Sequence, residues 1–259
     1  MKILNLISRL IDYPTEDLYQ AGNELVEVIN NDELLSNEDK VGLLSFIQGR
    51  CLVNGQAKMD ILDWQSDYDA LFERGRSVSL LLFEHIHGES RDRGQAMIDL
   101  IAHYKEAGLD IGIRELPDYI PLFLEFVATQ GEEAGTGWMQ DVSHIFALLY
   151  VRLAQRNSDY APLFKSLVNI SKAEINFEDL ATQVKGEKRD DTKEAIDKVW
   201  EEEMVKFGPD SESSVCGTAI NKPSETQRRD QEVPINFMET VIDETLAKDA
   251  TAQLSVGGK

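Results

Sequence analysis

Apolar residues recur along most of this chain at the three- and four-residue spacing of amphipathic helices, and no stretch alternates as a strand would. The predicted inward positions are Ile3, Ile7, Leu10 and Ile11; Leu18, Ala21, Leu25, Val28 and Ile29; Val41, Leu44 and Ile47; Ile61, Trp64, Tyr68, Leu71 and Phe72; Val78, Leu81, Leu82, His85 and Ile86; Met97, Leu100, Ile101 and Tyr104; Leu116, Ile120, Phe123, Leu124 and Val127; and Trp138, Val142, Ile145, Phe146, Leu149 and Leu153. The pattern predicts an all-α fold, a single helical bundle domain with short connections over residues 1–207.

Breaks between these segments carry the residues that helix ends and turns require. Thr15 is expected to cap the helix that follows it, and Asn54-Gly55 is expected to form a turn. Gly108 is expected to end a helix with a positive φ. The glycine-rich stretch 131–137 is expected to be a loop before the last long helix.

The C-terminal third has a different character, because its apolar density falls from about Lys172 onward. Asp191 and Glu194 are expected to cap one more helix, and its apolar stripe would consist of Ile196, Val199, Trp200, Met204 and Phe207. Residues 208–259 are rich in polar and charged side chains, which predicts a flexible acidic and polar tail that is largely disordered. A weak amphipathic stretch at 235–246 is expected to order on contact with a partner.

The charge of the chain restricts its partners. It has 47 acidic and 26 basic residues among 259, a formal net charge of -21. Such an excess repels nucleic acid and anionic lipid and attracts cationic partners, although a role in solubility alone stays open. Cys51 and Cys216 form no C-x-x-C, which indicates a reducing compartment. The apolar N-terminal stretch is interrupted by Asn5, Ser8, Arg9 and Asp12, which spoils a signal-peptide core, and no apolar run is long enough to span a bilayer. We therefore expect a cytoplasmic protein with no stable membrane association.

Catalytic and metal-binding patterns are missing from the sequence. His85 and His87 form an H-x-H, but residues two apart on a helix point to different sides, so His85 is expected to line a core or a groove. No G-x-S-x-G occurs, and the stretch 131–137 lacks the lysine of a phosphate loop. We therefore predict no enzymatic activity and no cofactor or metal held by this chain.

Five arginines between positions 74 and 114 gather basic charge in this otherwise acidic chain. They are Arg74, Arg76, Arg91, Arg93 and Arg114. The favoured interpretation pairs them with neighbouring carboxylates in a surface network. Contact with an acidic partner or with a phosphate-bearing ligand is the alternative.

The segment ELPDYIPLFLEF, residues 115–126, contains two prolines four apart. If Pro117 were the first helical residue, Pro121 would lack the N–H that should bond the carbonyl of residue 117. The first turn would then be open or kinked, with a free backbone acceptor between Glu115 and Asp118. Local packing and a binding role are both compatible with this pattern.

Two stretches, YDALFERGRSVSLLLFEHIHGESRDRGQAM and RELPDYIPLFLEF, closely resemble the delta-subunit family of respiratory nitrate reductase, within the wider group of molybdoenzyme maturation chaperones. The likeness extends to residues 189–207 and to Cys216-Gly217. The family motif Y-x-x-L-F-x-x-G falls on Tyr68, Leu71, Phe72 and Gly75, and the motif E-x-P-D falls on Glu115, Pro117 and Asp118. Tyr119 stands where relatives often have histidine, so no imidazole role is transferred.

This resemblance implies a non-catalytic, all-helical chaperone that binds the apo catalytic subunit of respiratory nitrate reductase. Such proteins hold the N-terminal segment of that subunit, support insertion of its molybdenum cofactor and delay its docking at the membrane. Cofactor-delivery proteins are further expected partners, whereas nucleic acid is not. A structural subunit of a membrane-bound redox complex, a chaperone for another molybdoenzyme and a nucleotide-binding module are the alternatives.

Together with the helical pattern, the resemblance predicts an apolar groove for the client between the helices bearing Tyr68–Phe72 and Ile120–Phe126. The predicted client-binding residues are Tyr68, Leu71, Phe72, Gly75, His85, Glu115, Pro117, Asp118, Tyr119, Phe123, Leu124 and Phe126.

Overall fold

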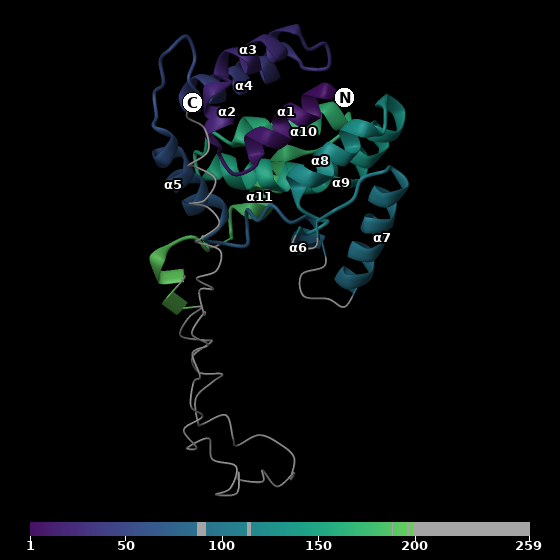
Figure 1. Ribbon diagram of the computed structural model, residues 1–259. Helices are drawn as coiled ribbons and strands as arrows, with labels where there is room; N and C mark the ends of the chain where they lie inside the picture. The colour runs from purple at the N-terminus through teal and green to yellow at the C-terminus, as the bar shows by residue number, and fades with distance from the viewer. Residues whose placement is uncertain (87–91, 113–114, 188, 196, 199–259) are drawn as a thin grey trace, which may run out of the picture. The chain divides into compact units, whose positions relative to one another are not determined.

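The computed structural model describes residues 1–86, 92–112, 115–187, 189–195 and 197–198 (Figure 1). Its helices are α1 (Lys2–Ile11), α2 (Glu16–Gln20), α3 (Gly22–Asn31), α4 (Asn37–Arg50), α5 (Ile61–Phe72), α6 (Leu82–Ile86), α7 (Asp92–Glu106), α8 (Ile120–Thr129), α9 (Glu132–Gln155), α10 (Ala161–Ser171) and α11 (Phe177–Val184). Within these ranges strand-type pairing is limited to two isolated β-bridges, so the all-α prediction is confirmed.

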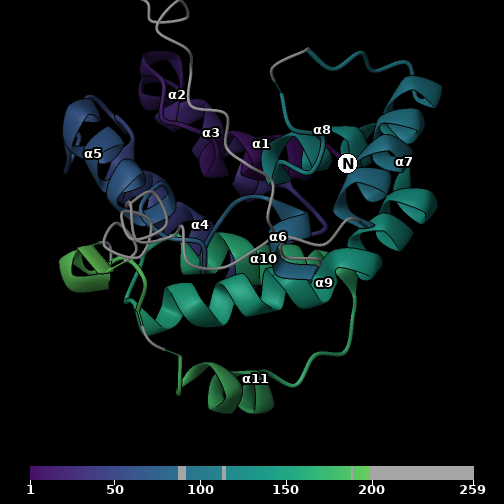
Figure 2. The same cartoon turned by 90° about the horizontal axis from the view of Figure 1, so that it is seen from below.

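The long helix α9 lies at the centre of the helical packing. It contacts α10, α8 and α11, and α10 in turn contacts α4 and α1. Figure 2 shows α10 and α11 on opposite sides of α9. The core includes the buried aromatic side chains of Phe46, Trp64 and Tyr160, and the Trp64 indole N–H donates to the Tyr160 hydroxyl at 2.7 Å. The buried polar atoms of these two aromatic side chains therefore satisfy each other.

Helix α1 packs along α8, and one polar contact fixes how the two meet. The Ser8 hydroxyl, which is buried, donates to the Pro121 carbonyl oxygen at 2.8 Å. Proline at the second position of α8 costs the helix no hydrogen bond, since the first N–H groups of a helix have no partner within it. The contact brings Asp12, just after α1, beside the first turn of α8.

The predicted helix ends are largely confirmed. The Thr15 side chain accepts the Leu18 N–H and so caps α2. Asn54 and Gly55 both have positive φ, at 52° and 74°, and form the predicted turn. Gly108 follows α7 with a φ of 78°, a conformation that glycine adopts without strain.

Four residues that were predicted to face inward are exposed: Val28 at 43%, Val41 at 68%, Ile86 at 47% and Leu116 at 46%. The buried face of α4 is made by Leu43, Phe46 and Ile47. The helix predicted from Val78 shortens to α6, because residues 77–78 form a turn and Leu81 bridges Tyr119.

The glycine-rich stretch 131–137 is helical and is not the predicted loop. Gly131 is the N-cap of α9, with a φ of 82°, and Glu132 and Glu133 form the acidic first turn. A Cβ on Gly135 would lie 3.2 Å from the Val127 carbonyl oxygen, so the close approach of α8 and α9 favours glycine there. Helices α10 and α11 had no counterpart among the predicted elements.

The predicted tail at 208–259 lies outside the described residues, as do Ile196, Val199, Trp200, Met204 and Phe207. At the start of that predicted helix, the Thr192 hydroxyl accepts the Ala195 N–H at 3.2 Å, whereas the Asp191 carboxylate pairs with arginines. Cys51 is fully buried, which raises the pKa of its thiol to about 12. None of the helices in the described ranges has the length and apolar character that crossing a bilayer requires.

Candidate functional site

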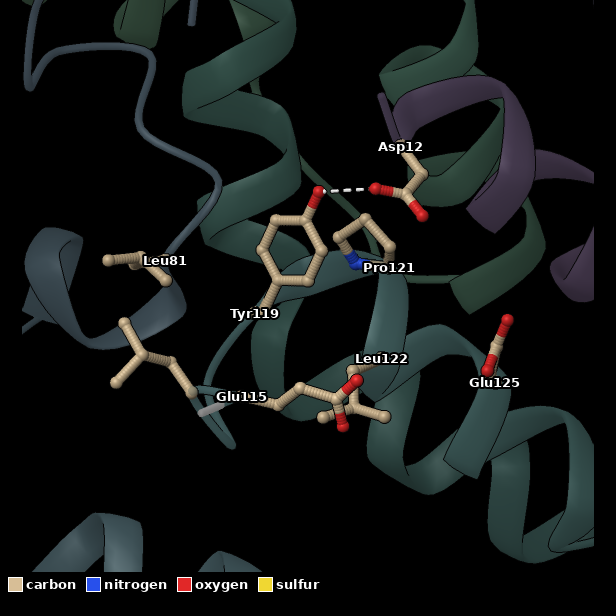
Figure 3. A pocket seen from close by; sticks show the side chains of 8 residues that line it. Asp12, Leu81, Glu115, Tyr119, Pro121, Leu122 and Glu125 are labelled. Atoms are coloured by element: carbon tan, nitrogen blue, oxygen red, sulfur yellow. Dashed lines mark hydrogen bonds between the residues drawn. The ribbon is translucent and has the colours of Figure 1, made fainter. Parts of the chain in front are cut away.

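A pocket of about 430 Å³ opens where the end of α1, the residues before α6 and the start of α8 meet (Figure 3). Its apolar lining comes from Leu81, Leu116, Pro121 and Leu122, and its polar lining from Asp12, Glu115, Tyr119 and Glu125. We call it the Tyr119 pocket. Three carboxylates around an apolar surface suit a segment that presents both apolar and cationic side chains.

Backbone pairing between two distant segments forms one wall of the Tyr119 pocket. The Leu82 N–H donates to the Asp118 carbonyl at 2.9 Å, and the Ile120 N–H donates to the Leu80 carbonyl at 2.8 Å. These bonds flank the bridge between Leu81 and Tyr119 and hold both side chains at the pocket. The two halves of the wall are 38 residues apart in sequence, which is why helical periodicity alone does not reveal it.

The two prolines of the 115–126 segment do not share a helix. Pro117 precedes α8, and its carbonyl oxygen accepts the hydroxyl of the buried Tyr104 at 2.8 Å. The free backbone acceptor expected from the sequence is therefore occupied. The bond also ties α7 to the segment that lines the Tyr119 pocket.

The Tyr119 hydroxyl connects three parts of the fold. It donates to Asp12 Oδ1 at 2.7 Å (Figure 3). It also lies 3.4 Å from the Tyr68 hydroxyl of α5. Burial raises the pKa of Tyr119 above its ordinary value, and the neighbouring Tyr68 raises it further. The phenol therefore stays protonated and holds the Asp12 carboxylate at the pocket.

Asp118 lies behind the wall of the pocket and does not line it. Its side chain is 0% exposed, Oδ2 accepts the Phe83 N–H at 3.2 Å, and Arg93 Nη2 of α7 lies 3.5 Å away. Oδ1 of Asp118 and Nε of Arg93 make no hydrogen bond within the described part of the chain. Burial raises the pKa of the Asp118 carboxyl, and the Phe83 N–H and Arg93 only partly oppose this. Asp118 thus joins α6, α7 and the pocket wall from inside the protein.

The raised pKa of Asp118 predicts a pH effect on stability. A carboxyl whose pKa is raised by folding contributes fully when protonated, and this contribution is lost as the pH rises through its folded-state value. We expect urea denaturation to show that the natural protein gains stability relative to Asp118→Asn as the pH falls from neutral toward the ordinary carboxyl range. Asp63→Asn, at an exposed position of α5, is the control. A difference that stays constant or shrinks on acidification would contradict the assignment.

The predicted groove between α5 and α8 is not open, and this part of the prediction is wrong. Its five intended wall residues are almost fully buried: Tyr68 at 3% exposure, Phe72 at 5%, Phe123 at 1%, Leu124 at 0% and Phe126 at 1%. They pack against one another and against other core side chains, as in the Tyr68–Phe72 ring pair at 4.9 Å. Helical spacing gives the apolar face of a helix, but not whether that face meets the core or a client.

Of the other predicted client-binding residues, some are buried in the structure and some line the pocket. His85 Nε2 lies 2.8 Å from the Ser79 carbonyl oxygen, and burial lowers the pKa of the imidazole. Leu71 is half-buried against the core, and Pro117 is buried. Among the predicted residues, Glu115 and Tyr119 line the Tyr119 pocket.

Sequence reasoning missed several pocket residues. They are Asp12, Leu81, Leu116, Pro121, Leu122 and Glu125. Leu122 offered a signal, because it is an apolar residue outside the inward stripe of its helix. Asp12 offered none, since only the packing of α1 on α8 brings it to the site.

The arginine network is confirmed in part. Arg93 lies 3.7 Å from Glu84 and 3.5 Å from Asp118. Arg91 and Arg114 lie outside the described residues. The favoured interpretation as ion pairs therefore holds for Arg93, although one of its partners is fully buried.

Comparison with known proteins shows where this architecture belongs. The model of the family described as nitrate reductase delta subunit matches residues 31–166. The chain is 45% identical over 207 residues to the nitrate reductase molybdenum cofactor assembly chaperone NarJ of Escherichia coli (strain K12). The aligned region covers 80% of this chain and 85% of that relative. The chain belongs to the nitrate reductase delta subunit family.

Other relatives of this delta subunit family member carry similar names. It is 38% identical over 222 residues to the "Probable nitrate reductase molybdenum cofactor assembly chaperone NarW" of Escherichia coli (strain K12), covering 86% of this chain and 90% of the relative. It is 27% identical over 166 residues to the "Probable nitrate reductase molybdenum cofactor assembly chaperone NarJ" of Bacillus subtilis (strain 168), and the match covers 62% of this chain and 84% of that relative. The predicted family is confirmed, and both family motifs fall within the matched range.

Proposed function

We propose that this chain is a dedicated assembly chaperone of respiratory nitrate reductase. It binds the apo catalytic subunit, supports insertion of the molybdenum cofactor and delays membrane docking until maturation is complete. The supporting observation is the 45% identity to a nitrate reductase molybdenum cofactor assembly chaperone over 80% of the chain. A cytoplasmic location follows from this proposal, because the client is matured before it reaches the membrane.

The Tyr119 pocket is the proposed binding site for the N-terminal segment of the client. Leu81, Leu116 and Leu122 offer apolar contact, while Glu115 and Glu125 offer acceptors for cationic side chains. Apolar burial contributes roughly 25 cal/mol per Å² before ordering costs are subtracted. The net charge of -21 would speed encounter with a basic segment more than it adds to affinity.

A chaperone role also requires release of the client. A small pocket with a charged rim gives moderate affinity, since only a few side chains of the client segment are buried in it. In this proposal the chain holds no cofactor and catalyses no reaction; the molybdenum cofactor belongs to the client. Within the described residues no three histidine, cysteine, aspartate or glutamate side chains are grouped as a metal site would require.

The proposal is tested by deleting the gene for this chain and purifying the nitrate reductase. We expect a reductase whose molybdenum content per catalytic subunit is several-fold lower, restored when the natural gene is supplied again. The same purification shows whether the chain remains bound. A chain that stays in the finished, cofactor-loaded complex would indicate a structural subunit, and unchanged molybdenum content would indicate another client.

A further inference from the structure

A second polar site lies away from the Tyr119 pocket, where the turn after α5 meets the C-terminal part of α9. There the Asp190 carboxylate is held on both oxygens: Oδ2 accepts the Ser77 N–H at 2.7 Å, and Oδ1 accepts the Ser77 hydroxyl at 2.6 Å and Arg156 Nη2 at 2.9 Å. Burial alone raises the pKa of Asp190, but the hydrogen bonds from Ser77 and Arg156 outweigh it and hold the pKa below its ordinary value. The site therefore stabilises a negatively charged group.

Gly75 makes room for that group. A Cβ on Gly75 would lie 2.7 Å from Oδ1 of Asp190, closer than real Cβ contacts permit. The final glycine of the motif Y-x-x-L-F-x-x-G therefore allows an acidic group to approach closely here. We call Gly75, Ser77, Arg152 and Arg156 the arginine cradle.

In the arginine cradle, one hydrogen-bond donor of Arg156 has no acceptor among the described residues. The Arg156 side chain is only 7% exposed, and its Nη1 lies 3.6 Å from Asp191 Oδ2 and makes no hydrogen bond to any described residue. A hollow of about 80 Å³ lies beside it, with Ser77, Arg152 and Arg156 among its lining residues. A buried guanidinium N–H without an acceptor is costly, so an additional acceptor oxygen there would be favourable.

The carboxylates that meet the cradle come from one short segment. Glu187 forms a bidentate pair with Arg152, with both distances 2.8 Å, and Asp190 and Asp191 approach Arg156. We call Glu187 and residues 189–191 the acidic strap. Among the described residues that line the hollow, Glu187 provides the carboxylate, and it belongs to the acidic strap. When the strap residues are left out, the charged side chains of the lining are Arg152 and Arg156.

We propose that the arginine cradle is a binding site for a phosphate-class oxyanion, and that the acidic strap occupies it as an internal competitor. A backbone N–H, a hydroxyl, a glycine and paired guanidinium groups are what proteins use to hold phosphate. A phosphate group offers more acceptor oxygens than the two of a carboxylate, so it can also reach Arg156 Nη1. The proposal extends beyond the chaperone role and does not depend on the Tyr119 pocket.

The test is calorimetric titration of the full chain with inorganic pyrophosphate at constant ionic strength. The variant Glu187→Gln, Asp190→Asn, Asp191→Asn removes the competing charge and keeps the side-chain sizes. We expect it to bind pyrophosphate about tenfold or more tightly than the natural protein, because charge-assisted hydrogen bonds are freed. Adding Arg156→Gln to this variant is expected to abolish the gain. A nucleoside diphosphate is the second probe, and it shows whether the site takes a free anion or a phosphate group that is part of a larger ligand. Tighter binding than that of pyrophosphate indicates the larger ligand, and equal binding indicates the free anion.

Circular dichroism verifies that each variant is folded. If the triple variant does not fold, Asp190→Asn alone leaves the Arg152–Glu187 pair in place and is expected to show a smaller gain of the same sign. A folded strap variant that binds pyrophosphate no better than the natural protein overturns the proposal. So does a gain that survives Arg156→Gln.

Discussion

Replacing Phe72 and Leu124 together by alanine is expected to unfold the chain rather than to weaken client binding selectively. Both side chains are buried, at 5% and 0% exposure. Truncating them is expected to cost about 3–5 and 2–5 kcal/mol, adding up if the sites are independent. The summed cost of about 5–10 kcal/mol is comparable to the whole stability of a domain, about 5–15 kcal/mol, so we expect most of the stability to be lost. Urea denaturation followed by circular dichroism measures the loss.

Leu122→Ala is the matched control, since Leu122 lies on the same helix but is half-buried and lines the Tyr119 pocket. This variant is expected to stay folded and to bind the client peptide less tightly. If the Phe72 and Leu124 double variant kept its stability and lost peptide binding, those side chains would be client contacts after all. That result would support the original prediction of a client-binding groove between α5 and α8.

Reversing the charge of Glu115 and Glu125 is expected to weaken binding of the client N-terminal peptide by about 10- to 100-fold, or about 1.4–2.8 kcal/mol. Both carboxylates line the pocket and are exposed, so their replacement by lysine should leave the fold intact. Repulsion of cationic side chains in the peptide would cause the loss. Calorimetry with the peptide and the full chain, at low and at high salt, measures it.

The control is Glu24→Lys with Glu27→Lys on α3, where both side chains are exposed and do not line the pocket. It changes the net charge by the same amount. Any weakening in this control is expected to be small and to vanish at high salt, because it reflects long-range attraction alone. Equal weakening in both double variants would show that binding depends on net charge and not on the Tyr119 pocket.

The fold was largely predictable from the sequence because a helix is a local structure with a local signal. The stripe at Ile3, Ile7 and Leu10 and the cap at Thr15 are confirmed, since their spacing and hydrogen bonds lie within a few residues. Val41 shows the limit of this reasoning. The spacing of apolar residues shows which face of a helix is apolar. How much of that face is buried depends on where the neighbouring helices pack.

The candidate site was less predictable because it is built from contacts between distant segments. The motifs pointed to Glu115, which lines the pocket beside Tyr119, but also to Phe72 and Asp118, which are buried behind it. A motif records that a residue type is required, not whether it is required for packing or for contact. The bridge of Leu81 with Tyr119 and the arrival of Asp12 depend on tertiary structure.

Helix α7 is anchored to the pocket segment by the Tyr104–Pro117 hydrogen bond and the Arg93–Asp118 pair, yet no described α7 residue lines the pocket. Any displacement of residues 117–119 by an occupant must therefore be transmitted to α7. By thermodynamic reciprocity, a ligand of α7 whose affinity changes when the pocket is occupied changes the affinity of the pocket by the same factor. A substitution that shifts α7 is expected to change the affinity of the pocket as well. A mutational scan that measures only the affinity for the client peptide would thus assign α7 to the contact surface, although α7 affects the pocket indirectly.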